Sequence, residues 1–404
     1  MLTPRPYQIV GRDFLAGRRH ALLADEMRVG KTPQAILAAQ KVGAQKVLVV
    51  CPAIAVAHWE REFVRWWPQD TVALVRSYDR AKLQWDSLTS QRWDVTIVDE
   101  AHFAKNPEAQ RTKLVYGKNG LGWCSDRLWA LSGTPAPKHA GELWPMLRAF
   151  GVVEMTYAEF VGRYCTVNPL TLAITGTHTD MIPELRALLD KVMLRRKRKD
   201  VAPDMPDIDF NFLEVTPTAK VDLKIPAGLS DAQLDAWLES QQAVDKEDRV
   251  AVALAKVGPL ADEIEFAIHN NLLDRTVAFG WHIEPLKALV RSLMARDIRA
   301  ELIIGATSQT EREGILQRLR DGTTQVVVAN ILAAGTAVDM SSASHAFMLE
   351  LDWVSGNNVQ AANRLISMEK TEKVTVDVVT WPGSADDRVQ KVLLRRVAQL
   401  ATLY

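Results

Sequence analysis

Short apolar runs alternate along the chain with longer segments in which apolar residues recur at helical spacing, most regularly in the second half. Strands that alternate with helices form a parallel sheet covered on both faces. Right-handed crossovers then bring the carboxyl ends of the strands to one edge, where ligands bind. In the second half the predicted strands are 276–279, 300–304, 325–329, 345–351 and 373–380, and the predicted helices are 284–295, 310–320 and 386–403.

The first half has similar apolar runs, which are predicted as strands at 46–52, 93–98 and 127–131 and as helices at 9–17, 57–67 and 181–200. Trp59, Phe63 and Trp66 recur at i, i+4 and i+7, which favours a core face over stacking on bases. The prolines of residues 202–207 break the helical pattern. We therefore expect one lobe at 1–200, with a small helical insertion near 151–200, and a second lobe at 201–404.

Residues 22–32 join an apolar run to a helical segment through a loop that ends in Gly30-Lys31-Thr32. This strand–loop–helix setting is typical of a phosphate-binding loop, whose amides and helix N-terminus direct partial positive charge at the phosphates. Lys31 would reach the β- and γ-phosphates, and the Thr32 hydroxyl would help to hold Mg²⁺. The residues expected to line the nucleotide here are Asp25, Met27, Arg28, Val29, Gly30, Lys31 and Thr32.

An acidic motif, Asp99-Glu100-Ala101-His102, follows the predicted strand 93–98. Adjacent carboxylates can divide two tasks, with Asp99 holding Mg²⁺ and Glu100 orienting the attacking water. A surface turn with two solvated acids is the alternative, but the position at a strand end after the phosphate loop favours the catalytic interpretation.

Two weaker signals flank these motifs. Gln8, after Arg5, precedes the phosphate loop and carries the paired donor and acceptor that can recognise an adenine edge. Ser132 and Thr134 follow the predicted strand 127–131, where small hydroxyl residues can couple the nucleotide state to movement of the lobe. Taken alone, the second signal is better explained by an ordinary turn.

Composition excludes several classes of protein. The 404 residues contain 49 basic and 49 acidic side chains, so any surface for a polyanion must be a local patch. Three widely spaced cysteines argue against a disulfide scaffold or structural zinc. The apolar runs are too short to span a bilayer. We expect an intracellular monomer without membrane contact, cytoplasmic in a bacterium or virus and nuclear in a eukaryote.

Further motifs, taken in chain order, resemble those of the Swi/Snf family of superfamily 2 motors. They are Arg5-Pro6-Tyr7-Gln8, Val49-Val50-Cys51-Pro52, Asp99-Glu100-Ala101-His102 with Lys105-Asn106, Leu131-Ser132-Gly133-Thr134-Pro135, residues 159–165 and residues 193–201. The resemblance implies an α/β fold of two tandem RecA-like domains, each a mainly parallel sheet flanked by helices. It also implies ATP and Mg²⁺ between the lobes, and translocation on double-stranded DNA.

The resemblance extends into the second lobe, where residues 333–339 and 357–365 match the fifth and sixth motifs. It implies nucleotide contacts for Gly335, Asp339 and Gln360, and it makes Arg364 the arginine that reaches the γ-phosphate. The nucleic-acid contacts it implies are Lys105, Arg195, Arg196 and Thr336, although the basic cluster 195–199 is also typical of a solvated helix end or a patch that braces the lobe. His102 joins Ser132 and Thr134 as a coupling residue.

Two departures from the family pattern bear on catalysis. Ser367 stands where the sixth motif has its second arginine; Lys370, one turn on, is the candidate substitute, although a point charge does not reproduce a guanidinium fork. Arg28 replaces a glycine of the phosphate loop and can point away from the phosphate or donate to it. Residues 249–257 resemble the HARP-like, or annealing-helicase, branch.

We therefore predict a DNA-dependent ATP hydrolase, a helicase-like motor on duplex DNA that also accepts forked or single-stranded DNA and can work with an accessory protein. Two alternatives stay open. An ATP-gated DNA clamp would hydrolyse little ATP because Ser367 replaces an arginine finger, and a helicase of the same superfamily would act on single strands or RNA.

Overall fold

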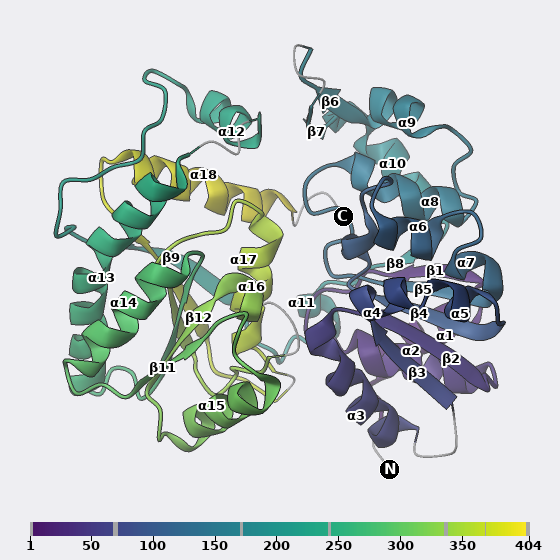
Figure 1. Ribbon diagram of the computed structural model, residues 1–404, viewed down its shortest axis with the longest axis horizontal. Coiled ribbons are helices and arrows are strands. Elements are labelled where there is room, and N and C mark those ends of the chain that lie inside the picture. Colours follow the sequence, from purple (N-terminus) through teal and green to yellow (C-terminus); the bar gives the residue numbers. More distant parts are fainter. Residues whose placement is uncertain are drawn as a thin grey trace. The chain divides into compact units, whose positions relative to one another are not determined.

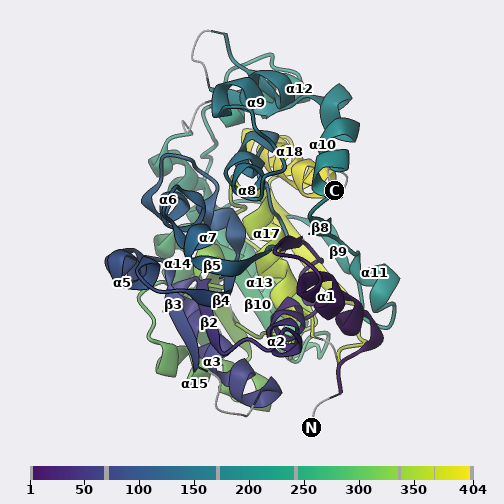
Figure 2. The ribbon, with the colours of Figure 1, turned by 90° about the vertical axis from the view of Figure 1, so that its right-hand side faces the viewer.

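The computed structural model describes residues 3–67, 72–169, 173–240, 244–334, 338–367 and 369–400. The chain forms two compact units, Met1–Pro203 and Asp204–Thr402. Figures 1 and 2 show a sheet within each unit with helices around it. None of the helices in the described part of the chain combines the length and the apolar character needed to span a lipid bilayer.

Unit 1 is built on a six-stranded parallel sheet with the order β3-β2-β4-β5-β1-β8. Its strands are β1 (His20–Leu23), β2 (Lys46–Cys51), β3 (Val72–Ser77), β4 (Trp93–Asp99), β5 (Ser125–Leu131) and β8 (Met193–Leu194). The longer helices are α1 (Pro6–Ala16), α2 (Lys31–Lys41), α3 (Val56–Trp66), α6 (Gln110–Tyr116), α9 (Tyr157–Tyr164) and α10 (Ile182–Leu189). A short antiparallel pair, β6 (Cys165–Val167) and β7 (Ile174–Thr177), follows α9.

The two faces of this sheet carry separate apolar cores. On β1, Leu23 packs with residues of α1, α2 and α3, whereas its neighbour Leu22 packs with residues of α6, α9 and α10. Successive side chains of a strand point to opposite faces, so a strand buried on both sides must be apolar throughout. This explains why the strands of unit 1 appear in the sequence as continuous apolar runs.

Unit 2 repeats the plan with a parallel sheet of order β11-β12-β10-β13-β14-β9. Its strands are β9 (Ile208–Glu214), β10 (Thr276–Gly280), β11 (Ala300–Ile303), β12 (Val326–Asn330), β13 (His345–Met348) and β14 (Val374–Thr380). Its helices are α12 (Asp231–Ser240), α13 (Lys246–His269), α14 (Ile283–Met294), α15 (Gln309–Asp321), α16 (Ile331–Ala334), α17 (Ser355–Ala362) and α18 (Ala385–Leu400). The predicted α/β class, with mainly parallel sheets flanked by helices, is confirmed.

One predicted element is wrong. Residues 181–200 are not a single helix, because α10 ends at Leu189 and the chain then enters β8 and a short helix, α11 (Arg198–Val201). Met193 and Leu194 pair with Leu22 and Leu23 of β1, so the sheet takes up residues that fit a helical pattern. The edge strands β3 and β9 were also missed, although residues 208–212 of β9 alternate between apolar and polar as in a half-buried strand.

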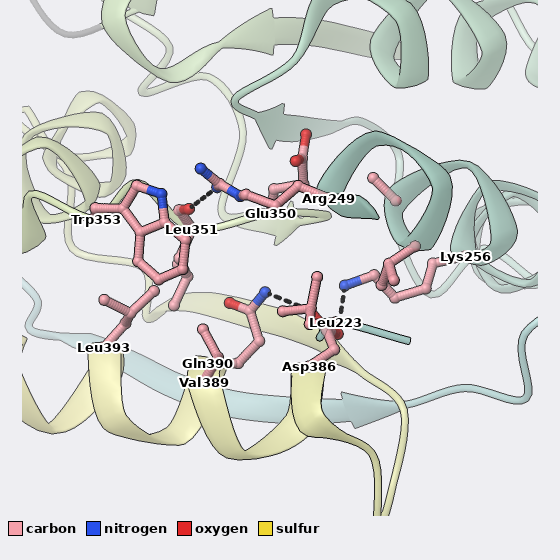
Figure 3. Close-up of a pocket in the computed structure, with 12 residues that line it drawn as sticks. Leu223, Arg249, Lys256, Glu350, Leu351, Trp353, Asp386, Val389, Gln390 and Leu393 are labelled. Atoms are coloured by element: carbon pink, nitrogen blue, oxygen red, sulfur yellow. Dashed lines mark hydrogen bonds and ion pairs between the residues drawn. The ribbon is translucent and has the colours of Figure 1, made fainter. Parts of the chain in front are cut away.

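A buried ion pair joins two helices of unit 2 beside a pocket between α13, α18 and the chain after β13 (Figure 3). The Lys256 side chain is 1% exposed, and its Nζ atom donates to Asp386 Oδ2 at 2.8 Å and to the Val379 carbonyl at 3.1 Å. Arg249 lies over the ring of Trp353, 4.5 Å from its centroid. Because these cations already have protein partners, we interpret the pocket as part of the packing of unit 2.

Candidate nucleotide site

The predicted phosphate loop lies at the carboxyl end of β1 and leads directly into α2. Gly30, the residue before the helix, has a left-handed backbone with φ of 73°. Arg28 also has a left-handed backbone, with φ of 67°, at the position where the sequence departs from glycine. A non-glycine residue pays on the order of 1–2 kcal/mol for this conformation. Arg28 therefore adopts the backbone conformation that a glycine would adopt here, but at a higher conformational free energy.

Lys31, the first residue of α2, folds back over this loop. Its Nζ atom donates to the carbonyl oxygens of Asp25 and Glu26 at 2.8 and 3.1 Å. Burial lowers the pKa of Lys31, while the negative charges of Glu100, Asp25 and Asp99 oppose that shift. The structure thus brings the predicted phosphate-binding lysine into the field of the predicted acidic pair.

Gly133, within the motif that follows β5, also belongs to this site, which the sequence alone did not reveal. A Cβ atom at this position would lie 3.0 Å from Met27 Cγ and 3.5 Å from Lys31 Nζ. The contact with Met27 would be tight, whereas the one with Lys31 is at ordinary van der Waals distance, so the glycine makes room for the Met27 side chain of the phosphate loop.

Asp99 ends β4 and is held by two donors. Its Oδ2 atom accepts a hydrogen bond from Trp59 Nε1 at 2.8 Å, and its Oδ1 atom accepts one from the Glu100 backbone at 3.0 Å. Burial, with the nearby charge of Glu100, raises the pKa of Asp99 to about 6. Trp59 is fully buried, as its spacing predicted, but its contact with Asp99 was missed. A buried indole N–H usually has a hydrogen-bond acceptor, so the predicted burial of Trp59 could have pointed to a polar partner nearby.

Glu100 and the predicted coupling residues form a connected group. His102 Nδ1 lies 3.0 Å from Ser132 Oγ and 3.3 Å from Glu100 Oε2. The Thr134 backbone N–H donates to Ser132 Oγ at 3.2 Å. Burial, followed by the positive charge of Lys105, lowers the pKa of His102 to about 3, so its ring is neutral near pH 7. The turn after β5 is therefore hydrogen-bonded to His102 of the acidic motif, and the neutral ring of His102 lies close to Glu100.

The basic residues predicted to contact nucleic acid lie within networks of unit 1. Arg195 Nη1 donates to the carbonyls of Ala24 and Gly133 at 3.0 and 3.1 Å. Arg196 forms an ion pair with Asp25, whose side chain is fully buried. Lys105 Nζ lies 2.7 Å from Glu142 Oε1. These contacts give no support to a DNA role for the two arginines, because both guanidinium groups bind the phosphate loop or the residues beside it.

That arrangement follows from the pairing of β8 with β1, which carries the chain after Leu194 alongside the loop. Asp25 was predicted to line the nucleotide, but it is enclosed beneath the loop and bound to Arg196. We therefore describe Asp25 as a support of the loop.

The two residues predicted to contact adenine, Arg5 and Gln8, lie at the start of α1. The Arg5 backbone N–H donates to Gln8 Oε1 at 2.9 Å, and Gln8 is buried. This bond caps the helix and fixes the side chain of Gln8, while recognition of adenine by Arg5 and Gln8 stays a prediction.

The predicted site residues of unit 2 are only partly described. Gly335 and Thr336 lie outside the described residues. Gln360 is buried on α17, and Arg364 follows in a turn at Asn363–Leu365. Asp339 Oδ1 accepts a hydrogen bond from the Ser341 backbone at 3.1 Å. The roles of these residues toward the nucleotide stay predictions.

Lys370 is not placed to replace the missing second arginine of the sixth motif. Its Nζ atom donates to the carbonyls of Ser341 and Ala343, each at 2.7 Å, and its side chain is buried. Desolvation lowers the pKa of Lys370, which further reduces its value as a cation for phosphate. The sequence-based suggestion that Lys370 substitutes for that arginine is therefore not supported.

Comparison with protein families gives a clear result. The SNF2-related domain matches residues 7–75 and 68–223, more than half of the chain, and the helicase conserved C-terminal domain matches residues 256–369. The chain belongs to the SNF2-related domain family. The phosphate loop, the acidic motif and the coupling residues of this SNF2-related chain all lie within the first match.

Two curated relatives extend over almost all of this SNF2-related chain. The SWI/SNF-related matrix-associated actin-dependent regulator of chromatin subfamily A-like protein 1 of Xenopus tropicalis is 26% identical over 421 residues, covering 98% of the chain and 44% of the relative. The DNA annealing helicase and endonuclease ZRANB3 of Mus musculus is 25% identical over 438 residues, covering 97% of the chain and 40% of the relative. The chain thus spans less than half the length of either relative.

A similar solved structure is the SWI2/SNF2 ATPase core of Sulfolobus solfataricus in complex with dsDNA, with a TM-score of 0.47 and 20% sequence identity. The match covers 100% of this chain and 93% of that one.

The left-handed backbone of Gly30 generates the first prediction. Gly30→Ala places a Cβ in a conformation that costs about 1–2 kcal/mol, and we expect it both to lower stability and to abolish nucleotide binding by distorting the loop. Gly43→Ala is the matched control, because Gly43 has φ of 69° and, among the described residues, no atom lies within 4 Å of an added Cβ. Thermal melts should show similar losses for both variants, and nucleotide titration should distinguish them. Equal nucleotide affinity in the two variants would contradict the assignment of the loop.

The buried, neutral His102 generates the second. The unfolded chain protonates a histidine near pH 6.5, but burial holds the pKa of His102 to about 3 in the folded protein. Stability should therefore fall as pH drops below about 6.5, by about 1.4 kcal/mol per pH unit from this group. His102→Gln removes the titration, so between pH 7 and pH 5 the variant should lose about 2 kcal/mol less than the wild type in urea unfolding. An identical loss in both proteins would show that His102 is protonated in the fold.

Proposed function

We propose that this chain is an ATP-dependent motor on double-stranded DNA that hydrolyses MgATP between its two RecA-like lobes. The observation that carries the proposal is the convergence of Lys31, the Asp99–Glu100 pair and the His102–Ser132 contact at the carboxyl edge of one sheet. Family membership supports the same interpretation, and the mouse relative is named a DNA annealing helicase.

The residues of unit 1 fit a magnesium–triphosphate. A hydroxyl at Thr32 and a carboxylate at Asp99 are hard oxygen donors of the kind that Mg²⁺ prefers. Lys31 and the amides at the start of α2 would bind the β- and γ-phosphates and neutralise charge that develops during transfer.

Glu100 is the residue we assign to the attacking water. Its carboxylate lies beside the neutral His102, which also contacts Ser132 on the neighbouring strand end. A movement of Glu100 during hydrolysis would therefore shift the Ser132–Thr134 turn through His102. We propose that this movement couples the state of the nucleotide to the conformation of the rest of the lobe. Arg364 of unit 2 would supply the arginine that stabilises the transition state.

Duplex DNA is the proposed track, and its recognition need not involve the bases. Contacts with phosphates position a protein without reading sequence, and they make binding strongly dependent on salt. Because the net charge of the chain is zero, these contacts must come from a local patch. We propose that forked or single-stranded DNA and an accessory protein modify this activity.

The test is an ATPase assay of the wild type, Lys31→Ala and Lys41→Ala without nucleic acid and with single-stranded DNA, duplex DNA, forked DNA or RNA. Lys41 lies at the exposed far end of the same helix in an ion pair with Asp13, so it is the matched control. We expect duplex DNA to stimulate the wild type and Lys41→Ala, and Lys31→Ala to lose roughly two to three orders of magnitude in rate. Stimulation should decline steeply with added salt.

An unchanged rate in Lys31→Ala, or no effect of duplex DNA, would contradict the proposal. Stimulation confined to single strands or RNA would point instead to a helicase of a related branch.

A further inference from the structure

A buried polar cluster beneath the phosphate loop joins Asp25, Gln34 and Arg196. Arg196 Nε donates to Asp25 Oδ1 at 3.0 Å, and its Nη2 atom contacts Asp25 Oδ2, so the guanidinium grips the carboxylate with two nitrogens. The same Nη2 donates to Gln34 Oε1 at 2.8 Å, and Gln34 Nε2 lies 3.3 Å from Asp25 Oδ2. Asp25 and Gln34 are fully buried, so each of these groups depends on the others for its hydrogen bonds.

This cluster contacts both sides of the proposed nucleotide site. On the phosphate side, Gln34 Nε2 donates to the Gly30 carbonyl at 3.1 Å. On the adenine side, Arg196 Nη1 donates to the Tyr7 carbonyl at 2.5 Å and its guanidinium lies over the ring of Tyr7, 5.7 Å from the centroid. Tyr7 belongs to α1 beside Gln8. A single guanidinium therefore ties the helix proposed to recognise adenine to the loop proposed to hold the phosphates.

The backbone around Arg196 is also bonded to the loop. The Ala24 N–H donates to the Leu194 carbonyl at 2.7 Å, and the Glu26 N–H donates to the Arg196 carbonyl at 3.1 Å. The Arg198 N–H donates to Glu26 Oε2 at 2.7 Å. The segment after β8 thus follows the loop residue by residue and holds the side chain of Arg196 in register with Asp25.

Close packing over the cluster leaves no room for adjustment. Gly11 of α1 faces it, and a Cβ at that position would lie 1.7 Å from Gln34 Oε1 and 2.9 Å from Arg196 Nη2. These atoms are the ends of polar side chains that are already hydrogen-bonded, so they could move only by breaking those bonds. Gly11 therefore offers a way to displace the cluster without changing its charges.

We propose that Arg196 is a positioning residue for the phosphate loop, acting through Asp25 and Gln34. The inference rests on the proposed function and adds a determinant of nucleotide affinity that does not touch the nucleotide. Because Arg196 lies in the segment that leads out of unit 1 at Pro203, the shape of the loop depends on the chain that connects the two units.

The test compares Arg196→Lys with Arg163→Lys. Arg163 also grips a carboxylate with two nitrogens, Nε to Glu184 Oε1 at 2.9 Å and Nη2 to Glu184 Oε2 at 2.6 Å, but this pair is exposed. A lysine keeps the charge and loses the fork, so Arg196→Lys should raise the KM for ATP about tenfold or more while kcat changes much less. It should also reduce the thermal stabilisation produced by MgADP. Arg163→Lys should match the wild type in both measurements.

A role in folding alone would lower the melting temperature but leave the KM of the folded protein unchanged. Gly11→Ala is the second variant, which displaces the cluster from the opposite side, and it should raise KM in the same way even if Arg196→Lys does not fold. A KM within twofold of the wild type in the folded variants would overturn the inference. If the wild type does not hydrolyse ATP, the proposed function fails, and MgADP-induced stabilisation still decides the role of Arg196.

Discussion

The site depends on one constraint: the charged side chains buried at the carboxyl edge of the unit 1 sheet must be partnered within the protein. Asp25 is enclosed without access to water, and the Arg196 guanidinium satisfies it. An unpartnered charge in such surroundings would be strongly destabilising. Lys31 likewise rests on loop carbonyls within the field of Asp99 and Glu100. Charged residues of the proposed nucleotide site therefore also hold the backbone of the phosphate loop in place.

The parallel sheet makes this concentration of charge achievable. In unit 1 the ends of β1, β4 and β5 lie on adjacent strands, so the phosphate loop, the acidic pair and the Ser132 turn meet at one edge. Apolar residues pack against both faces of the sheet and hold these strands in place. The polar residues of the site follow at the carboxyl ends of the strands. Packing of the sheet therefore determines where the phosphate loop, the acidic pair and the Ser132 turn lie in this SNF2-related chain.

Much of this was predictable from sequence, because strands buried on both faces are continuous apolar runs and the motifs follow their ends. The α/β class, the phosphate loop and the placement of Asp99 at the carboxyl end of β4 all followed from that pattern. The two-residue strand β8 could not be found in the same way, since a strand this short carries no periodicity. Without β8, the sequence left open whether Arg195 and Arg196 contact nucleic-acid phosphates, end a solvated helix or brace the lobe. Pairing of β8 with β1 turns both arginines toward the loop, which favours the bracing role. The buried contacts of Lys370 were equally invisible, because its carbonyl partners come from a distant turn.

The structure of the protein bound to Mg²⁺ and a non-hydrolysable ATP analogue, with duplex DNA present, is the most direct measurement of the central claim. We expect the β- and γ-phosphates on the amides of Gly30, Lys31 and Thr32, with Mg²⁺ next to Thr32 and Asp99. We also expect the Arg364 guanidinium to approach the γ-phosphate. Phosphates bound away from this loop, or a nucleotide that Arg364 does not approach, would contradict that claim.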